Sequence, residues 1–198
     1  MPGKLINNSG LCLKYVIFKK SLEMLPKSRL FITLLAILGG AISMPVSGQW
    51  LTSIPEDGIA GEQNNFAHSP MAVAMPYMIF PYDKLTAWIG VGCNSSEEWA
   101  LFGFSAAPVL LGTSTEEGYH RISTRIKWDD QEENVTLKQR WNDPFIHFSE
   151  DKEAISRIEG SATVQLELNW QGQGTTWFQF SLSGASAALA KIRRACAD

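Results

Sequence analysis

The chain has 198 residues, of which 45% are hydrophobic, 11% aromatic and 19% charged, a composition that excludes a disordered protein. Its charge is unevenly distributed. Residues 1–48 contain six basic residues and one acidic residue, which leaves 11 basic and 19 acidic residues in 49–198 and a net charge of −8 there. Because phosphate contacts need clustered Lys and Arg, this acidic body argues against nucleic acid as a partner.

Residues 1–48 have the pattern of an N-terminal extension followed by a secretory signal peptide. Two basic residues precede an apolar run over 30–42, and small polar residues follow it up to Gly48. A start at Met24 would give a signal of ordinary length, with cleavage near 48/49. An uncleaved anchor is the alternative, although the 13 apolar residues span only about 20 Å of a hydrocarbon core of about 30 Å. We therefore expect a periplasmic or secreted protein that meets the membrane only through this signal.

Three cysteines occur, and Cys12 lies in the leading segment. Cys93 and Cys196 remain, and a pair of cysteines in an exported domain is most simply a disulfide. Two buried free thiols are the alternative. Neither cysteine belongs to a C-x-x-C motif, so redox catalysis and a zinc site have no support.

The predicted elements begin with an irregular lead-in over 49–84, which four prolines interrupt. Within it, 71–80 suits an edge strand or a packed loop. From residue 85 onward, apolar and polar side chains alternate with the period of half-buried strands. The strands predicted in this way are 85–93, 98–105, 119–128, 134–141, 162–170 and 175–182.

Two helices are predicted among these strands. A short helix near 150–158 has acidic residues in its first turn, and a C-terminal helix over 184–195 has apolar residues at helical spacing. Together the elements predict a mainly β fold, a small antiparallel β-sandwich or barrel-like domain over 85–198.

The order of features from residue 85 to the C-terminus resembles the VasI/TagO group of type VI secretion-associated periplasmic proteins. A strand ends in Cys93, Arg125 lies on a later strand, Arg140-Trp141 is followed by Ser149 and a short helix, and the tail FSLSGASAALAKIRRAC covers 180–196. The resemblance covers roughly half the chain. It implies a non-enzymatic accessory role at the envelope of a Gram-negative bacterium, with the cysteines paired.

The sequence contains no recognisable catalytic, metal or cofactor motif. His68, His120 and His147 lack the spacing of a metal site, and the chain lacks the G-x-S-x-G motif of a serine nucleophile. Adjacent carboxylates such as Asp129 and Asp130 point to opposite faces of a strand or lie at turns. We therefore expect no catalytic residue, no metal and no cofactor.

A basic strand face and two outward tryptophans are the candidate binding surfaces. Basic side chains on the predicted strand 119–128 would face others on 134–141, and could receive an acidic partner. A solvated face paired with local acids is the alternative. The other tryptophans of the late strands, including Trp141, share the parity of apolar neighbours and are expected in the core. The candidate binding residues are Arg121, Arg125, Lys127, Arg140, Trp88 and Trp177.

We therefore expect an exported, non-enzymatic accessory or binding protein of the cell envelope, with protein partners there. Type VI secretion is the assembly that the resemblance implies. The alternatives are a structural envelope protein without a specific ligand and a secreted hydrolase of unrecognised type.

Overall fold

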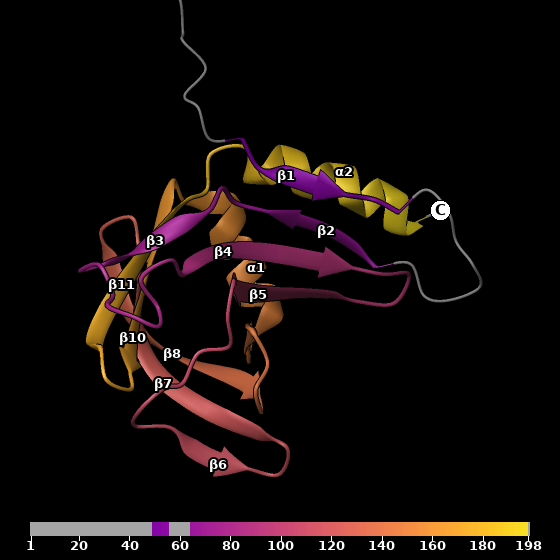
Figure 1. Cartoon of the computed structure of the whole chain (residues 1–198). Coiled ribbons are helices and arrows are strands. Elements are labelled where there is room, and N and C mark those ends of the chain that lie inside the picture. Colours follow the sequence, from indigo (N-terminus) through magenta and orange to yellow (C-terminus); the bar gives the residue numbers. More distant parts are fainter. Residues whose placement is uncertain (1–48, 56–63, 198) are drawn as a thin grey trace, which may run out of the picture. The chain divides into compact units, whose positions relative to one another are not determined.

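The computed structural model describes residues 49–55 and 64–197, which belong to one folded unit (Figure 1). The predicted extension and signal over 1–48 lie outside the described residues. The strands are β1 (Leu51–Ser53), β2 (Asn65–His68), β3 (Ala72–Met75), β4 (Thr86–Cys93), β5 (Glu98–Phe104), β6 (Ser114–Glu116), β7 (Tyr119–Trp128), β8 (Gln131–Arg140), β9 (Phe145–Phe148), β10 (Thr163–Trp170) and β11 (Gly174–Ser181). The helices are α1 (Asp151–Gly160) and α2 (Ala185–Ala197).

Eight antiparallel strands close into a barrel, so the predicted mainly β fold is confirmed in its barrel-like form. The ring runs β4–β3–β11–β10–β7–β8–β9–β5 and returns to β4. β2 extends β4 beyond the end of β3, β1 pairs with β2, and β6 pairs with β7. Closure leaves few unpaired strand edges, which are the usual liability of a sheet.

The six strands and two helices predicted from sequence all occur, within a few residues of their predicted ends. The alternation does not predict β6 or β9, since each has only three or four residues. At the β7–β8 turn Asp129 adopts a positive φ of 51°, and its carboxylate accepts hydrogen bonds from the backbone N–H groups of Ala162 and Thr163. The acidic turn therefore ties this hairpin to the start of β10.

The expectation of an irregular lead-in over 49–84 is wrong in one respect that matters for the fold. Three short strands occur there, and β3 completes the ring. β3 pairs on both sides, with β4 through Ala72 and Val73 and with β11 through Ala74 and Met75, so it is not an edge strand. β3 makes only two residue pairs with each neighbour, so its four residues carry no alternation long enough to predict a strand. Its extent is set by the partner strands β4 and β11.

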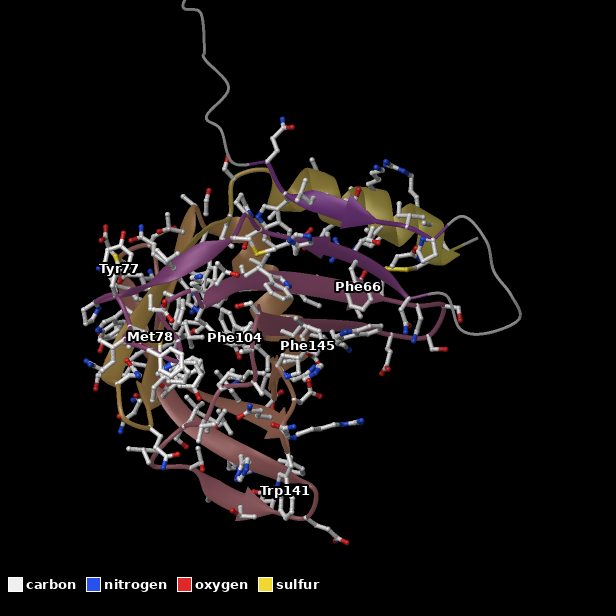
Figure 2. The ribbon with its side chains drawn as sticks, viewed as in Figure 1. Phe66, Tyr77, Met78, Phe104, Trp141 and Phe145 are labelled. Carbon is white, nitrogen blue, oxygen red and sulfur yellow. A yellow bond between two sulfur atoms is a disulfide. The ribbon has the colours of Figure 1, made fainter. Side chains whose placement is uncertain are left out.

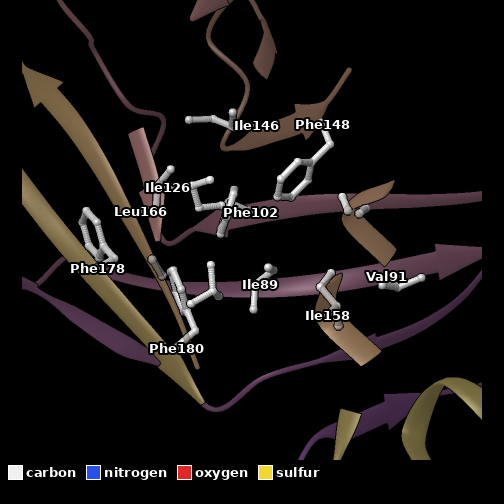
Figure 3. Close-up of a cluster of buried hydrophobic side chains, with 14 of the residues drawn as sticks. Ile89, Val91, Phe102, Ile126, Ile146, Phe148, Ile158, Leu166, Phe178 and Phe180 are labelled. Atoms are coloured by element: carbon white, nitrogen blue, oxygen red, sulfur yellow. The ribbon is translucent and has the colours of Figure 1, made fainter. Parts of the chain in front are cut away.

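The barrel interior is filled with aliphatic and aromatic side chains (Figure 3). Alternate residues of every long strand point inward, and Ile158 of α1 joins them. The side chains labelled in the close-up are Ile89, Val91, Phe102, Ile126, Ile146, Phe148, Ile158, Leu166, Phe178 and Phe180. A packed interior leaves the outer surface and the barrel ends as the places where other molecules can be met.

α2 lies along β1 and β2 and is tied covalently to the barrel (Figure 1). It buries Ala188, Leu189 and Ile192. The predicted disulfide joins Cys93 at the end of β4 to Cys196 in α2, with the two Cα atoms 6.2 Å apart. Among the residues that the structure describes, no helix is both long enough and apolar enough to cross a membrane.

Candidate functional site

A groove on the outer face of β2, β4, β5 and β9 is lined mainly by apolar side chains. Its volume is about 370 Å³, within the range of ligand pockets. No charged side chain of Asp, Glu, Lys or Arg lines it. Figure 2 labels two of its residues, Phe66 and Phe145. The lining residues are Phe66, Ala67, His68, Met71, Trp88, Gly90, Trp99, Leu101, Phe145 and His147.

Strand register arranges the outward residues of this face in three rows, each with one glycine. Side chains at paired positions of neighbouring strands lie side by side on one face. The first row is Phe66–Gly92–Trp99, the second is His68–Gly90–Leu101–His147, and the third is Trp88–Gly103–Phe145.

The glycines of the outer two rows allow tryptophan rings to lie flat across the sheet. The ring of Trp99 covers Gly92, and the ring of Trp88 covers Gly103, in the space that a side chain at either glycine would occupy. An aromatic edge braces each ring. Phe66 meets Trp99 with centroids 5.8 Å apart at 79°, and Phe145 meets Trp88 at 6.3 Å and 81°.

The middle row forms the floor of the groove between these two aromatic walls. Gly90 has no side chain, and a Cβ atom there would lie 2.9 Å from the carbonyl oxygen of Ala67. Leu101 is nearly buried beside it. Three strand spacings separate His68 from His147, so the floor is roughly 14 Å wide across the sheet.

Two imidazoles stand at the ends of the floor. Nδ1 of His68 lies 2.8 Å from the carbonyl oxygen of Ser69, so this nitrogen carries a hydrogen and donates it. Burial lowers the pKa of His147, although Asp143 and Asp151 oppose the shift. The His147 ring is therefore neutral at pH 7, and the groove carries no charge there.

The structure places one predicted binding residue, Trp88, in this groove. Trp177 lies elsewhere, on β11, where the Arg125 guanidinium carbon is 5.2 Å from its ring centroid. Arg125 also forms ion pairs with Glu132, at 3.1 Å, and with Glu167. The predicted site residues therefore do not form one surface.

The predicted basic face is largely neutralised by its neighbours. Nε of Arg121 lies 2.9 Å from a Glu116 oxygen, and Nζ of Lys127 lies 3.7 Å from Asp130. Arg140 is exposed at the end of β8. These exposed pairs favour the alternative of a solvated face paired with local acids.

A larger cavity of about 900 Å³ lies between the disulfide, α1 and the β4–β5 turn. Five carboxylates line it, but several of them hold the fold together. Arg193 of α2 bridges Glu98 at 2.6 Å and Glu159 at 2.7 Å, and Asp151 accepts a hydrogen bond from the backbone of Ala100. Within 49–55 and 64–197, no group of three or more His, Cys, Asp or Glu residues is arranged to hold a metal ion.

Sequence reasoning missed most of the groove, although a signal for it exists. Outward positions of β4 and β5 read Trp-x-Gly-x-Gly over 88–92 and Trp-x-Leu-x-Gly over 99–103. Where tryptophan and glycine alternate at the solvent-facing positions of two paired strands, the indole ring of one strand is predicted to lie over a glycine of the other. The contributions of β2 and β9 had no such signal, because they depend on which strands become neighbours.

Comparison of the chain with models of protein families, with curated proteins and with solved structures finds no match. The site is therefore argued from its geometry and chemistry.

Proposed function

We propose that this chain is an exported binding protein of the cell envelope, which holds an apolar segment of a protein partner in the groove. The observation that supports this most directly is the uncharged, glycine-floored groove between two braced tryptophans. Tryptophan is among the residues that most often dominate the energy of protein interfaces, above all when water is excluded around it. Aromatic-lined grooves are also a recurring way to bind extended peptides.

The chemistry of the lining favours an apolar polypeptide segment over a sugar. A sugar ring could stack on the tryptophans, but its hydroxyl groups need several hydrogen-bonding partners. Besides the indole N–H groups of Trp88 and Trp99, the groove offers the two imidazoles of His68 and His147 as its polar side-chain groups. Aliphatic or proline side chains of a partner need no such groups, and they would replace water over Gly90 and Leu101.

Export and the envelope are supported by two further points. The disulfide between Cys93 and Cys196 suits an oxidising compartment. The resemblance of the tail to the VasI/TagO group makes an envelope subunit of a type VI secretion apparatus the partner that we favour. A structural protein without a ligand would leave the groove empty in the cell.

A photo-crosslinking amino acid at position 145, introduced in the native cells, tests the proposal. Phe145 lines the groove and is 37% exposed, while Trp141 is 61% exposed but does not line it, so position 141 is the matched control. We expect a discrete protein adduct from position 145 and none of that size from 141. Equal labelling at both positions would contradict a groove partner.

A second variant measures the contribution of the wall. Phe145→Ser removes the edge that braces Trp88, and we expect it to weaken capture of the partner by about tenfold or more. Trp141→Ser should leave capture unchanged. Identification of the captured protein as a secretion-apparatus subunit would support the accessory role, whereas any other envelope protein would replace that part of the proposal.

A further inference from the structure

One end of the barrel presents large apolar side chains to water. We call this surface the apolar end and define it as Tyr77, Ile79, Phe80, Val109 and Leu111. Tyr77 is 82% exposed, Phe80 84% and Ile79 68%, and the other two are about half exposed. Figure 2 labels Tyr77 on the loop that follows β3, far from Phe66 of the groove. This surface is separate from the proposed binding groove.

Both loops of the apolar end are fastened to the tip of the β10–β11 hairpin. The backbone N–H of Ile79 donates to Oε1 of Gln173 at 2.8 Å. The N–H of Gln171 donates to the carbonyl of Val109 at 2.9 Å, and the N–H of Leu111 donates to Asn169 at 2.8 Å. The apolar side chains of the two loops therefore flank one hairpin.

The exposure of these side chains is imposed by the fold. Met78, between Tyr77 and Ile79, is buried, and Tyr82 packs edge-on against Trp170 with centroids 5.0 Å apart. A loop anchored by Met78 and Tyr82 cannot turn its outward side chains into the core without giving up these contacts.

The apolar end also lacks charge, and several of its backbone N–H groups donate within the protein. Residues 76–82, 106–113 and 168–175 contain no Asp, Glu, Lys or Arg. The N–H of Tyr82 donates to Ile79 at 3.0 Å, and the N–H of Gln173 donates to Trp170 at 3.2 Å. Backbone groups that enter hydrocarbon must be satisfied in this way, because no water is available to them.

We propose that the apolar end inserts Tyr77, Ile79 and Phe80 into the interfacial region of a lipid bilayer. The side chains belong to two loops that flank one hairpin, and those of Tyr77, Ile79 and Phe80 are more than two-thirds exposed. A protein partner would need a matching cavity for each of them, whereas a fluid bilayer conforms to them. Aromatic side chains are also favoured at the headgroup level. This contact goes beyond the sequence-based expectation that the membrane is met only through the signal segment.

The surrounding charge indicates which lipid the apolar end prefers. Its nearest charged neighbours in sequence are Asp83 and Lys84, which cancel, and the body over 49–198 is acidic. Binding to anionic headgroups needs a cluster of basic residues, and it weakens as salt rises. The apolar end should therefore bind zwitterionic phosphatidylcholine vesicles at least as well as anionic ones, and salt should not release it.

A fluorescent amino acid whose emission depends on its surroundings, placed at position 80, tests the contact directly. The protein is purified from its native cells, with whatever N-terminal processing it undergoes there. With phosphatidylcholine vesicles we expect a blue shift, and quenching by brominated lipid, at position 80. The same probe at position 51 is the control, since Leu51 is 58% exposed on β1, away from this end. A probe at position 80 that stays in water overturns the proposal, whatever residues 1–48 do.

Variants test whether the apolar end contributes to binding. We expect Ile79→Ser/Phe80→Ser to lower the vesicle partition coefficient at least about tenfold, and Leu51→Ser to leave it within about twofold. A preference for anionic vesicles that is lost at high salt would overturn the bilayer proposal. So would a protein that self-associates through these residues in the absence of lipid, with the position-80 probe remaining in water when vesicles are added. The groove variant Phe145→Ser should not change partitioning, so failure of this proposal and of the groove proposal can be told apart.

Discussion

Two stretches of the chain, equal in length, differ sharply in the number of charged residues that they present to water. Residues 64–115, which include β2 to β5 and most of β6, contain four charged residues, and we call them the charge-poor stretch. Residues 116–167, which include β7 to β9, α1 and most of β10, contain nineteen, and we call them the charged stretch. Residues 168–190 contain none. Both stretches supply inward-facing apolar side chains to the same core, so the difference concerns the outer surface.

The outward side chains of the charged stretch form ion pairs with one another and are hydrated by water. Arg121 and Arg125 of β7 pair with acids of neighbouring strands, and Arg157 of α1 pairs with Glu133 of β8. Such a surface needs no partner.

The outward positions of the charge-poor stretch instead carry tryptophan, glycine and leucine, together with the side chains of the apolar end. Exposed apolar surface of this extent in a soluble domain usually marks an interaction site. The comparison indicates that the apolar end and most of the groove belong to the charge-poor stretch, while Phe145 and His147 of the groove come from β9 of the charged stretch.

The largest expected effect comes from the covalent link between β4 of the charge-poor stretch and α2. In the chain-entropy model a disulfide that closes a loop of about 100 residues stabilises a protein by about 4.7 kcal/mol, and strain reduces this value. We expect Cys93→Ala/Cys196→Ala to lower the free energy of unfolding by about 3–4 kcal/mol in urea denaturation. Two reactive thiols in the native, unreduced protein would show that no such link exists.

A side chain added to the glycine floor should cost more than one added to the charged stretch. Gly90→Val would force Cβ against the backbone carbonyl of Ala67, which cannot move without disturbing the pairing of β2 and β4. We expect a loss of about 1–3 kcal/mol. The control Ser123→Val, at an exposed position of β7, should change stability by less than about 0.5 kcal/mol. An equal loss in the free energy of unfolding at the two positions, measured by urea denaturation, would contradict this distinction between the two surfaces.

The bridge at Arg193 should contribute less than the disulfide beside it. Arg193→Ala leaves Glu98 and Glu159 facing each other without a cation, but all three side chains are about one-third exposed, so water screens much of the effect. We expect a loss of roughly 1 kcal/mol, which 1 M NaCl should reduce. Arg125→Ala, in a more exposed network, should shift the unfolding midpoint less than Arg193→Ala does.

The smallest expected effect is a pH dependence from His147. Because burial lowers its folded pKa while the unfolded side chain titrates near about 6.5, the unfolded chain binds more protons below that pH. Stability should therefore be fully present above about pH 6.5, fall as the pH drops below it, and level off once the lowered folded pKa is passed. The slope cannot exceed about 1.4 kcal/mol per pH unit. Unfolding curves of His147→Gln between pH 7.5 and 5 should be flatter than those of the parent, and identical slopes would contradict a buried neutral imidazole.

Sequence reasoning succeeded where a pattern was long and local. Strict alternation over eight to ten residues predicted β4, β7 and β10, and helical spacing predicted α2. It was wrong for Trp141, which shares the parity of the core residue Leu137 but lies just beyond the last residue of β8 and is 61% exposed. Parity holds only while the strand continues, and the strand end depends on the pairing with β7.

Only part of the candidate groove was visible in the sequence, for a related reason. Trp88 was singled out because it lies on the parity opposite to the apolar set, and it does form a wall of the groove. Its neighbours Phe66 and Phe145 come from β2 and β9, which flank β4 and β5 only in the folded sheet. The basic face was visible in sequence, but the acids that neutralise it, such as Glu116 and Glu167, come from other strands.

The amino-acid order thus specifies the long strands, both helices and the charge-poor stretch, because each depends on side-chain type and period along a single segment, and it names the two cysteines that can pair. Ring closure through the four residues of β3, the meeting of four strands at the groove and the outward display of Tyr77 and Phe80 depend on pairing between segments far apart in the chain. Such pairing is stabilised by the shared core as a whole, so it has no counterpart in any local pattern.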